Sequence, residues 1–340
     1  MRTTAVKCEV EQPIDFGTNV WYGATLDKLK SHLIEQIDII SSYPEKDAKS
    51  LRRLLARRYE LKDGNLIVTS GTFAAVNVIA RIFDRKKSLF VTPCGRKLVE
   101  GCEASNHEIV LSEDVNSLLE LDFTGIDLCW MANPNTVSGK QYRRKEILDM
   151  VDKHPEVTFI FNITYSNYVL DDLLKPSDIG SRKNMIMFSS VSKSYNLPGL
   201  RLAYIVAPDS IGKLLQKQVA SYSISTVAQE AGKYIFVHPA QFVIPLRKWL
   251  RNAEEFRTTL AAIPQIEVLP SSTPYFLIKL NVGEGGELAR FLLEKYNINI
   301  RTAEDICSLD SRFIGVSTRS QEENNLLVGA IQEWIESKIG

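Results

Sequence analysis

One lysine lies in a segment whose neighbours could bind an anion. Lys193 follows the hydroxyl residues Ser190 and Ser192, and a Pro-Gly turn and Arg201 come after it. The segment lies between two short apolar runs, so we expect the lysine at the end of a strand. A neutral lysine amine attacks carbonyl carbon, and hydroxyl and guanidinium groups bind phosphate. The alternative is an exposed lysine on a solvated loop without a chemical role.

Two further polar segments follow apolar runs. Ser70, Gly71 and Thr72 stand between a strand-like run and an amphipathic stretch, where backbone N–H groups at a helix start can bind phosphate. The alternative is that Ser70 or Thr72 only caps that helix. The second segment, Asn133–Gly139, contains Asn135 and also follows a strand-like run.

The elements that carry these segments alternate along the chain. Amphipathic stretches such as 74–83 and 142–151 lie between short apolar runs that are typical of strands buried on both faces. These runs are Leu66–Val68, Leu89–Val91, Leu128–Trp130, Phe159–Phe161, Ile186–Phe188 and Ala203–Val206. The order strand, helix, strand predicts an α/β fold with a mostly parallel sheet.

The rest of the chain has a different pattern. It predicts a long helix over 242–262, strands over 266–269 and 275–280, and a final helix over 321–335. We therefore expect a large domain over 46–239 and a smaller α+β domain built from 1–45 and 240–340. Because no Pro/Gly-rich linker separates them, a continuous helix is expected at the join.

Composition excludes several classes of function. The 340 residues carry 41 basic and 41 acidic side chains, and zero net charge argues against nucleic acid or an anionic membrane as the main partner. No apolar run is long enough to cross a membrane, and the N-terminus lacks an apolar segment, which predicts a cytoplasmic protein. Four isolated histidines indicate no metal site. Five cysteines without a C-x-x-C pair indicate reduced thiols, at Cys8, Cys94, Cys102, Cys129 and Cys307.

The segment from Ser189 to Arg201 resembles the cofactor-lysine motif of fold-type I pyridoxal-phosphate (PLP) enzymes. The resemblance implies that the Lys193 amine forms a Schiff base with the cofactor aldehyde. It also implies a large α/β domain with a smaller α+β domain, and a phosphate site formed by Ser70, Gly71, Thr72, Ser190, Ser192 and Arg201. The Asn133–Gly139 turn partly matches the family's NPNNPTG turn, which implies that Asn135 contacts the cofactor.

Nearly the whole chain is similar to the class I/II aminotransferase branch that contains histidinol-phosphate aminotransferase and L-threonine O-3-phosphate decarboxylase. Ile14–Asn19 resembles the branch's IDFSAN segment. Tyr43-Pro44 resembles its YP pair, whose tyrosine reaches the neighbouring subunit's cofactor, which implies a homodimer. Ile298–Arg301 and Ser308–Phe313 look more like the decarboxylase. This similarity implies that Arg301 binds the substrate's phosphate, with Asn19 nearby.

The resemblance implies a PLP-dependent decarboxylase that acts on a small phosphorylated amino acid, most closely threonine phosphate, in cobalamin biosynthesis. Transamination of the histidinol-phosphate type is the alternative reaction. In both, PLP and one substrate are the ligands, and the orientation of the substrate decides which bond breaks.

Three positions depart from the family pattern. The segment Asn162–Tyr165 stands where the family has residues that contact the cofactor, and the resemblance implies such contacts from Asn162 and Tyr165. At Asn162 an amide replaces the carboxylate that pairs with the cofactor's ring nitrogen. Gly315 stands where an arginine holds the substrate carboxylate, and the 93–97 segment lacks the aromatic residue that stacks on the ring. These departures support a second hypothesis, a PLP-binding homologue with a regulatory or scaffolding role.

Overall fold

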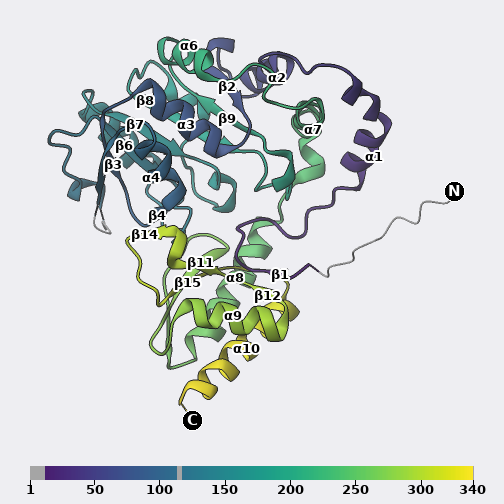
Figure 1. The fold of residues 1–340 in the computed structure, drawn as a ribbon, viewed down its shortest axis with the longest axis vertical. Helices are drawn as coiled ribbons and strands as arrows, with labels where there is room; N and C mark the ends of the chain where they lie inside the picture. Colours follow the sequence, from purple (N-terminus) through teal and green to yellow (C-terminus); the bar gives the residue numbers. More distant parts are fainter. Residues whose placement is uncertain (1–11, 113–116, 340) are drawn as a thin grey trace.

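The computed structural model describes residues 12–112 and 117–339 and contains two main sheets (Figure 1). The larger sheet has seven strands in the order β2-β9-β8-β7-β6-β3-β5, and the smaller has four in the order β10-β11-β15-β13. In the view of Figure 1 the larger sheet and its helices form the upper part of the molecule, and the smaller sheet lies below with α8, α9 and α10.

The larger sheet contains β2 (Leu66–Thr69), β3 (Lys87–Phe90), β5 (Glu108–Leu111), β6 (Leu128–Ala132), β7 (Thr158–Asn162), β8 (Met185–Ser190) and β9 (Ala203–Val206). The helices of this part are α1 (Asp27–Glu35), α2 (Lys49–Arg58), α3 (Thr72–Ile82), α4 (Arg96–Glu103), α5 (Arg144–Lys153), α6 (Asp209–Gln218) and α7 (Thr226–Val237). Strands β8, β7, β6, β3 and β5 run parallel, and β9 is antiparallel to both of its neighbours. The expected mostly parallel sheet is therefore present.

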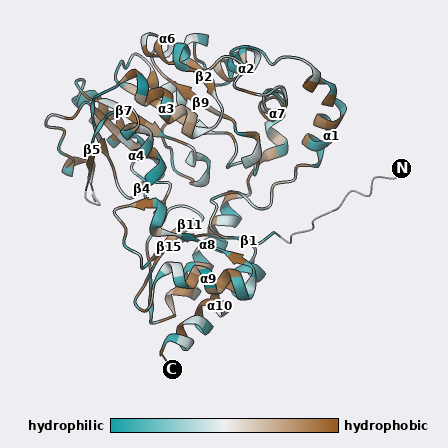
Figure 2. Ribbon diagram, viewed as in Figure 1, coloured by the Kyte–Doolittle hydropathy of each residue, from teal (hydrophilic) through white to brown (hydrophobic). Residues whose placement is uncertain are grey.

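Side chains from each strand feed two apolar layers, one on each face of this sheet. Along β2, Leu66 and Val68 pack in one buried cluster, while Ile67 packs in another with Ile186 and Ile205. This alternation follows from the two-residue period of a strand. Figure 2 shows the same contrast, with hydrophobic strands inside and more hydrophilic helices such as α2 outside. Strand β5 was not predicted, because it is an edge strand whose residues are partly exposed.

The smaller part contains β10 (Ile266–Val268), β11 (Tyr275–Leu280), β13 (Arg301–Thr302) and β15 (Phe313–Ser317), with α8 (Leu246–Ala261), α9 (Gly285–Tyr296) and α10 (Gln321–Ile339). Two short pairs complete the fold, β1 (Ile14–Asp15) with β12 (Ile298–Asn299) and β4 (Cys94–Gly95) with β14 (Ile306–Cys307). The strands expected over 266–269 and 275–280 and the final helix are present.

The expectation of a continuous helix at the join is wrong. Helix α7 ends at Val237, a 3₁₀ turn covers Pro239–Phe242, and α8 begins only at Leu246. Pro239 and Pro245 account for the break, because a proline ring lacks the backbone donor and clashes with the preceding helical turn. The connection is thus bent, and Tyr195, Tyr234 and Phe242 pack at the bend.

The N-terminal residues are shared between the two parts. Strand β1 pairs with β12 of the smaller part, whereas α1 packs on α7 and buries Leu29 in a core cluster of the larger part. We therefore propose that residues 46–239 form the large domain and that residues 12–45 of the segment 1–45, which was expected in the smaller domain, divide between the two. Residues 1–11, including Cys8, lie outside the described residues.

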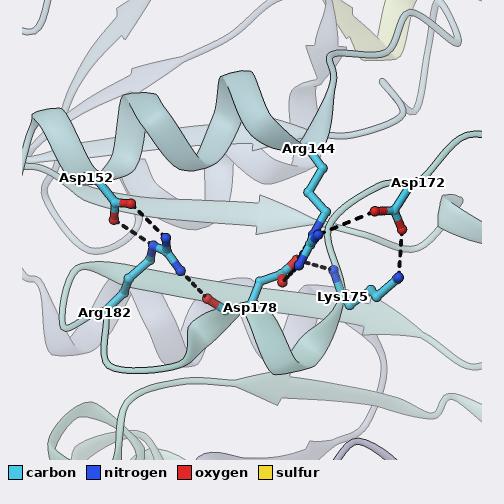
Figure 3. Close-up of polar contacts among 6 residues, drawn as sticks. All are labelled: Arg144, Asp152, Asp172, Lys175, Asp178 and Arg182. Carbon is cyan, nitrogen blue, oxygen red and sulfur yellow. Dashed lines mark hydrogen bonds and ion pairs between the residues drawn. The ribbon is translucent and has the colours of Figure 1, made fainter.

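An ion-pair network fixes the connection between β7 and β8 (Figure 3). Arg144 of α5 donates from Nε to Asp178 at 2.9 Å, and Arg182 donates to Asp152 of α5 from two nitrogens at 2.7 Å each. Arg182 also donates to the Asp178 carbonyl at 2.9 Å. Asp178 is buried, so its bidentate partner Arg144 offsets the cost of removing a carboxylate from water. The network holds α5 against the segment that leads into β8.

Cys94, Cys102, Cys129 and Cys307 are buried free thiols. Within 12–112 and 117–339, no three histidine, cysteine or acidic side chains are grouped as metal ligands would be. In the same ranges no helix combines the length and the apolar character that crossing a membrane requires.

Candidate active site

Polar segments meet at one edge of the large sheet. Strands β2, β6, β7 and β8 run in the same direction, so the segments after Thr69, Ala132, Asn162 and Ser190 all leave the sheet at its carboxyl edge. A cavity of about 310 Å³ lies there. Its lining includes seven of the site residues expected from the sequence, namely Asn19, Thr72, Asn162, Tyr165, Ser190, Lys193 and Arg301.

Hydrogen bonds hold the backbone at Lys193 and at the preceding residue. The Tyr168 hydroxyl donates to the Lys193 carbonyl at 3.0 Å, and the Leu197 N–H donates to the Ser192 carbonyl at 2.8 Å. Burial lowers the pKa of the Lys193 amine, and the nearby charges of Arg201 and Arg301 lower it further, against a smaller opposing effect of Asp15. The neutral, nucleophilic form of this amine is therefore more populated than that of an exposed lysine.

Gly71 and Arg201 lie against each other beside the start of α3. Gly71 has a φ of +91°, and a Cβ atom at this position would lie 2.6 Å from Nη2 of Arg201. No side chain caps α3, so Ser70 and Thr72 are not helix caps and the first amides of the helix stay available. This geometry is suited to an anion, which the helix amides and the guanidinium would bind together.

The ends of β7 and β8 are joined through Thr164. The Thr164 N–H donates to Oδ1 of Asn162 at 3.0 Å, and the Ser190 N–H donates to the Thr164 hydroxyl at 3.0 Å. Because Oδ1 of Asn162 is the acceptor here, its amide nitrogen Nδ2 is the group left to face the cavity. Ser190 in turn accepts from the Ser192 N–H at 3.1 Å, and the Ser192 hydroxyl is buried without a partner among the described residues.

Asn135 does not line the cavity, although the resemblance implies that it contacts the cofactor. Its Nδ2 donates to the Pro93 carbonyl at 2.9 Å, and its Oδ1 accepts from the N–H groups of Val137 and Ser138 at 2.9 and 3.0 Å. Asn135 therefore shapes the turn, and the next residue, Thr136, lines the cavity instead.

Asn19 and Arg301 come from the N-terminal segment and from β13. Asn19 is buried and donates to the Thr136 carbonyl at 3.0 Å. Burial lowers the pKa of Arg301, with smaller opposing effects from Tyr165 and Asp305, and no hydrogen bond or ion pair reaches its guanidinium from the described residues. Burial raises the pKa of Tyr165, while Arg301 and a hydrogen bond to Asn19 lower it.

Gly315 stands where the family has an arginine that binds the substrate carboxylate, and two nearby arginines could supply that group instead. Neither of them lines this cavity. Arg312 is exposed and donates to Asp310 at 3.1 and 2.7 Å. Arg319 donates to Glu323 at 2.9 Å and to the Asp15 carbonyl at 3.2 Å, and it lies over the rings of Phe16 and Tyr22. Both guanidinium groups are thus committed elsewhere.

Tyr43 is not brought to the cavity. Its side chain is 89% exposed, and its ring lies beside that of Tyr222, with ring centroids 5.7 Å apart. Ser70, Gly71, Ser192 and Arg201 stand beside the cavity rather than in its lining.

Several residues of the site were not predicted from the sequence. Phe73, Lys97, Thr136, Thr164 and Asp305 line the cavity, and Tyr168 supports the lysine. Phe73 places an aromatic ring there from α3, although the 93–97 segment has none. Phe73 adjoins one of the segments singled out in the sequence, and Lys97, Thr136 and Thr164 lie inside others, whereas Asp305 carried no local signal.

A second cavity of about 440 Å³ lies behind Thr164 and Ser190, which line both spaces. It contains the hydrogen-bonded hydroxyls of Tyr59 and Tyr204, 2.9 Å apart, but not Lys193. The reactive amine therefore places the candidate site in the first cavity.

Comparison with known proteins gives the same picture. Residues 11–331 match the family "Aminotransferase class I and II". Threonine-phosphate decarboxylase of Salmonella typhimurium is 24% identical over 97% of this chain and 93% of its own length. The crystal structure of L-threonine-O-3-phosphate decarboxylase from Porphyromonas gingivalis superposes with a TM-score of 0.93, at 36% identity over 95% of this chain and 99% of that one.

Histidinol-phosphate aminotransferase from Sinorhizobium meliloti, solved in complex with pyridoxal-5'-phosphate, has a TM-score of 0.78 at 18% identity, over 96% of this chain and 91% of that one. These matches confirm the expected fold-type I architecture. With a family match over nearly the whole length and a relative at 36% identity, the chain belongs to the class I and II aminotransferase family.

Proposed function

We propose that this chain is a PLP-dependent enzyme that decarboxylates threonine phosphate or a close phosphorylated amino acid. The observation that carries the proposal is the meeting of a lysine of lowered pKa and an unpaired arginine in one cavity. The family supports a PLP-dependent reaction. The similarity to threonine-phosphate decarboxylases, including that of Salmonella typhimurium, supports decarboxylation as that reaction.

The residues present fit the cofactor. Gly71 leaves the space that Arg201 occupies, and the uncapped start of α3 with Ser70 and Thr72 would hold the phosphate, together with Ser190, Ser192 and Arg201. Lys193 would hold the cofactor covalently. Nδ2 of Asn162 would donate to the ring nitrogen, while Tyr165 and the Asn135 turn would shape the pocket around the ring.

When bound, PLP supplies an electron-withdrawing ring that accepts the electron pair released at the substrate's α-carbon. The chain's own residues select the bond that breaks by orienting the substrate. Asn19 and Arg301 would hold its anionic groups, and Lys193 would deliver the proton that replaces the departing CO₂. Because Asn162 is neutral, it offers the ring nitrogen a hydrogen bond rather than an ion pair, which predicts a weaker electron sink.

The runner-up is transamination of the histidinol-phosphate type, which would use the same cavity and the same lysine. A catalytically weakened PLP-binding homologue is the third possibility, and Asn162 and Gly315 favour it. Product analysis separates the three. Incubating PLP-loaded protein with threonine phosphate should release CO₂ and leave an aminopropanol phosphate. With a 2-oxo acid added as the amino acceptor, an oxo product from threonine phosphate or from histidinol phosphate would indicate transamination. The absence of any product from either compound would indicate the weakened homologue.

We further propose a homodimer in the cytoplasm. Exposed apolar side chains gather on α1 and the 3₁₀ turn after it, with Ile34, Ile37 and Ile40 at 71%, 47% and 65% exposure, and Tyr43 follows them. Such a patch is typical of an interface. In a dimer, Tyr43 would leave solvent and could reach the partner subunit's cofactor.

A further inference from the structure

Two cysteines face each other where the two parts of the molecule meet. Strand β4 follows β3 of the larger part, and β14 follows β13 of the smaller part (Figure 1). The two strands pair antiparallel, with Cys94 directly opposite Cys307. Cα atoms of directly opposite residues in such a pair lie about 4.5–5.5 Å apart, which is within the range that a disulfide spans. The backbone therefore holds these two cysteines at a spacing that a disulfide can bridge.

The two thiols are also in contact. Cys94 and Cys307 are both buried and belong to one apolar cluster. Burial and, to a smaller degree, the charge of the Cys307 thiol and a hydrogen bond to it raise the pKa of Cys94 to about 12, against a smaller opposing effect of Arg96. The side chains thus point toward each other, as a disulfide requires.

The other two described cysteines are placed differently. Cys102 lies in α4, and Cys129 lies in β6, where its register partners on the neighbouring strands are Leu89 and Phe159. Burial raises the pKa of both thiols to about 12, with a smaller contribution of Glu103 at Cys102, and neither pKa responds to another thiol. Within the described ranges, the contact between two thiols is therefore specific to β4 and β14.

The neighbours of both cysteines line the candidate active-site cavity. Gly95 and Lys97 come directly after Cys94, Asp305 comes shortly before Cys307, and all three line the cavity. One wall of the cavity is therefore made from both parts of the molecule. Beside that wall the two parts are joined by strands of only two residues each. A covalent bond here would limit how far the parts can separate, and so how readily a ligand enters.

We propose that Cys94 and Cys307 form a reversible disulfide that ties the two parts of the molecule together beside the candidate active site. The oxidant would be a low-molecular-weight disulfide. One cysteine thiolate attacks it and displaces a small thiolate, and the other then attacks the protein sulfur of the mixed disulfide and displaces the second small thiolate. Two protein thiols are oxidised, the small disulfide is reduced to two thiols, and the two cysteine protons end on these thiols.

Burial should make this exchange slow. A protonated, buried thiol is a poor nucleophile, so the reaction requires local separation of β4 from β14. Because each strand has only two residues, little backbone pairing opposes that separation. The bond should therefore form and break over a long incubation without unfolding of the whole chain.

The test maps the disulfide on the full chain after incubation with oxidised glutathione. Free thiols are alkylated, and the protein is digested without reduction and analysed by mass spectrometry. The variants are Cys94→Ala and Cys307→Ala. Cys102→Ala is the matched control, because it removes a buried thiol of the same cluster and leaves the pair intact. Circular dichroism establishes that each variant is folded.

The parent and Cys102→Ala should each lose two titratable thiols and yield a peptide that joins Cys94 to Cys307. Dithiothreitol should restore both thiols, and neither Cys94→Ala nor Cys307→Ala should yield this linkage. A parent that keeps all five of its thiols, or a disulfide that joins any other pair, would overturn the proposal. The parent and the control decide the result even if one alanine variant is unstable.

Oxidation should also shift the unfolding of the parent to a higher urea concentration, because the disulfide closes a loop of roughly 200 residues in the unfolded chain. An unchanged midpoint would overturn the tie between the two parts. PLP should be incorporated more slowly into the oxidised parent, and dithiothreitol should restore the rate. Equal rates would overturn the effect on ligand entry.

Only the incorporation of PLP rests on the proposed function, because it requires the Lys193 amine. If neither the oxidised nor the reduced parent takes up PLP, the proposed function is wrong. The mapped disulfide and the urea midpoint still decide the proposal in that case.

Discussion

Replacing Asn162 by aspartate tests how the site treats the cofactor's ring nitrogen. Asn162 is only 9% exposed, and its Oδ1 accepts from the Thr164 N–H at 3.0 Å. An aspartate can keep that hydrogen bond, so its second oxygen would replace Nδ2 at the cavity wall. The substitution therefore exchanges a donor for an acceptor, and a neutral group for a charge, with little change in shape.

Without cofactor the new carboxylate should destabilise the protein. Burial raises the pKa of an unpaired carboxyl in the folded state above its value in the unfolded state, which is about 4. The free energy of unfolding of the variant is therefore highest below that pH and falls as the pH rises above it. We expect a loss of about 1–3 kcal/mol at pH 7 and a smaller loss at pH 5. Lys193 and Arg301 in the same cavity keep the loss within this range.

With PLP the aspartate should recover stability. A protonated ring nitrogen within about 4–6 Å of the carboxylate shifts its pKa by about 1–3 units, which corresponds to about 1.4–4 kcal/mol. Urea unfolding at pH 5 and pH 7, with and without PLP, measures both effects. Equal stabilisation of the parent and of Asn162→Asp by PLP would refute a charge interaction between residue 162 and the ring nitrogen.

Asn133→Asp is the matched control for this experiment. Asn133 is fully buried, and its Nδ2 and Oδ1 exchange hydrogen bonds with the Tyr142 backbone at 3.1 and 2.9 Å. It does not line the cavity. This variant should lose stability that PLP does not restore.

Three further predictions concern the site, and a fourth concerns the proposed dimer. Lys193→Ala should abolish both the visible band on adding PLP and the borohydride-trapped adduct, and an adduct that persists would contradict the assignment. The rate of PLP incorporation into the parent should rise with pH and level off below the pH expected for an exposed lysine, because the pKa of Lys193 is lowered. A plateau only near pH 10 or higher would argue against this. Gly71→Ala should weaken PLP binding by about tenfold, since the new methyl would meet Arg201 and φ is +91°, whereas Gly199→Ala, which meets nothing within 4 Å, is the neutral control. Ile40→Asp should shift the sedimentation of the protein from that of a dimer to that of a monomer. An unchanged dimer would exclude as the interface the exposed apolar surface formed by α1 and the 3₁₀ turn after it.

Sequence alone determined the parts of this protein that depend on local pattern. The apolar runs and their alternation with amphipathic stretches predicted six strands of the large sheet and its mostly parallel order, because buried parallel strands have a local compositional signature. Resemblance to the family's motifs located Lys193 and the segment around Gly71. The edge strand β5 and the break before α8 were missed, since partial exposure blurs the first pattern and two prolines interrupt the second.

The tertiary structure decided which side chains share the cavity and which are used elsewhere. Asn135 and Arg319 are correct residue types near the right segments, yet Asn135 is hydrogen-bonded to the backbone of a turn and Arg319 pairs with Glu323. The pairing of β13 with β15 sets Arg301 beside Gly315, and Lys97 and Asp305 join the site from distant parts of the chain. Local sequence sets what a residue can do, but hydrogen-bond competition and long-range packing set where its side chain lies, and these depend on contacts that no short segment contains.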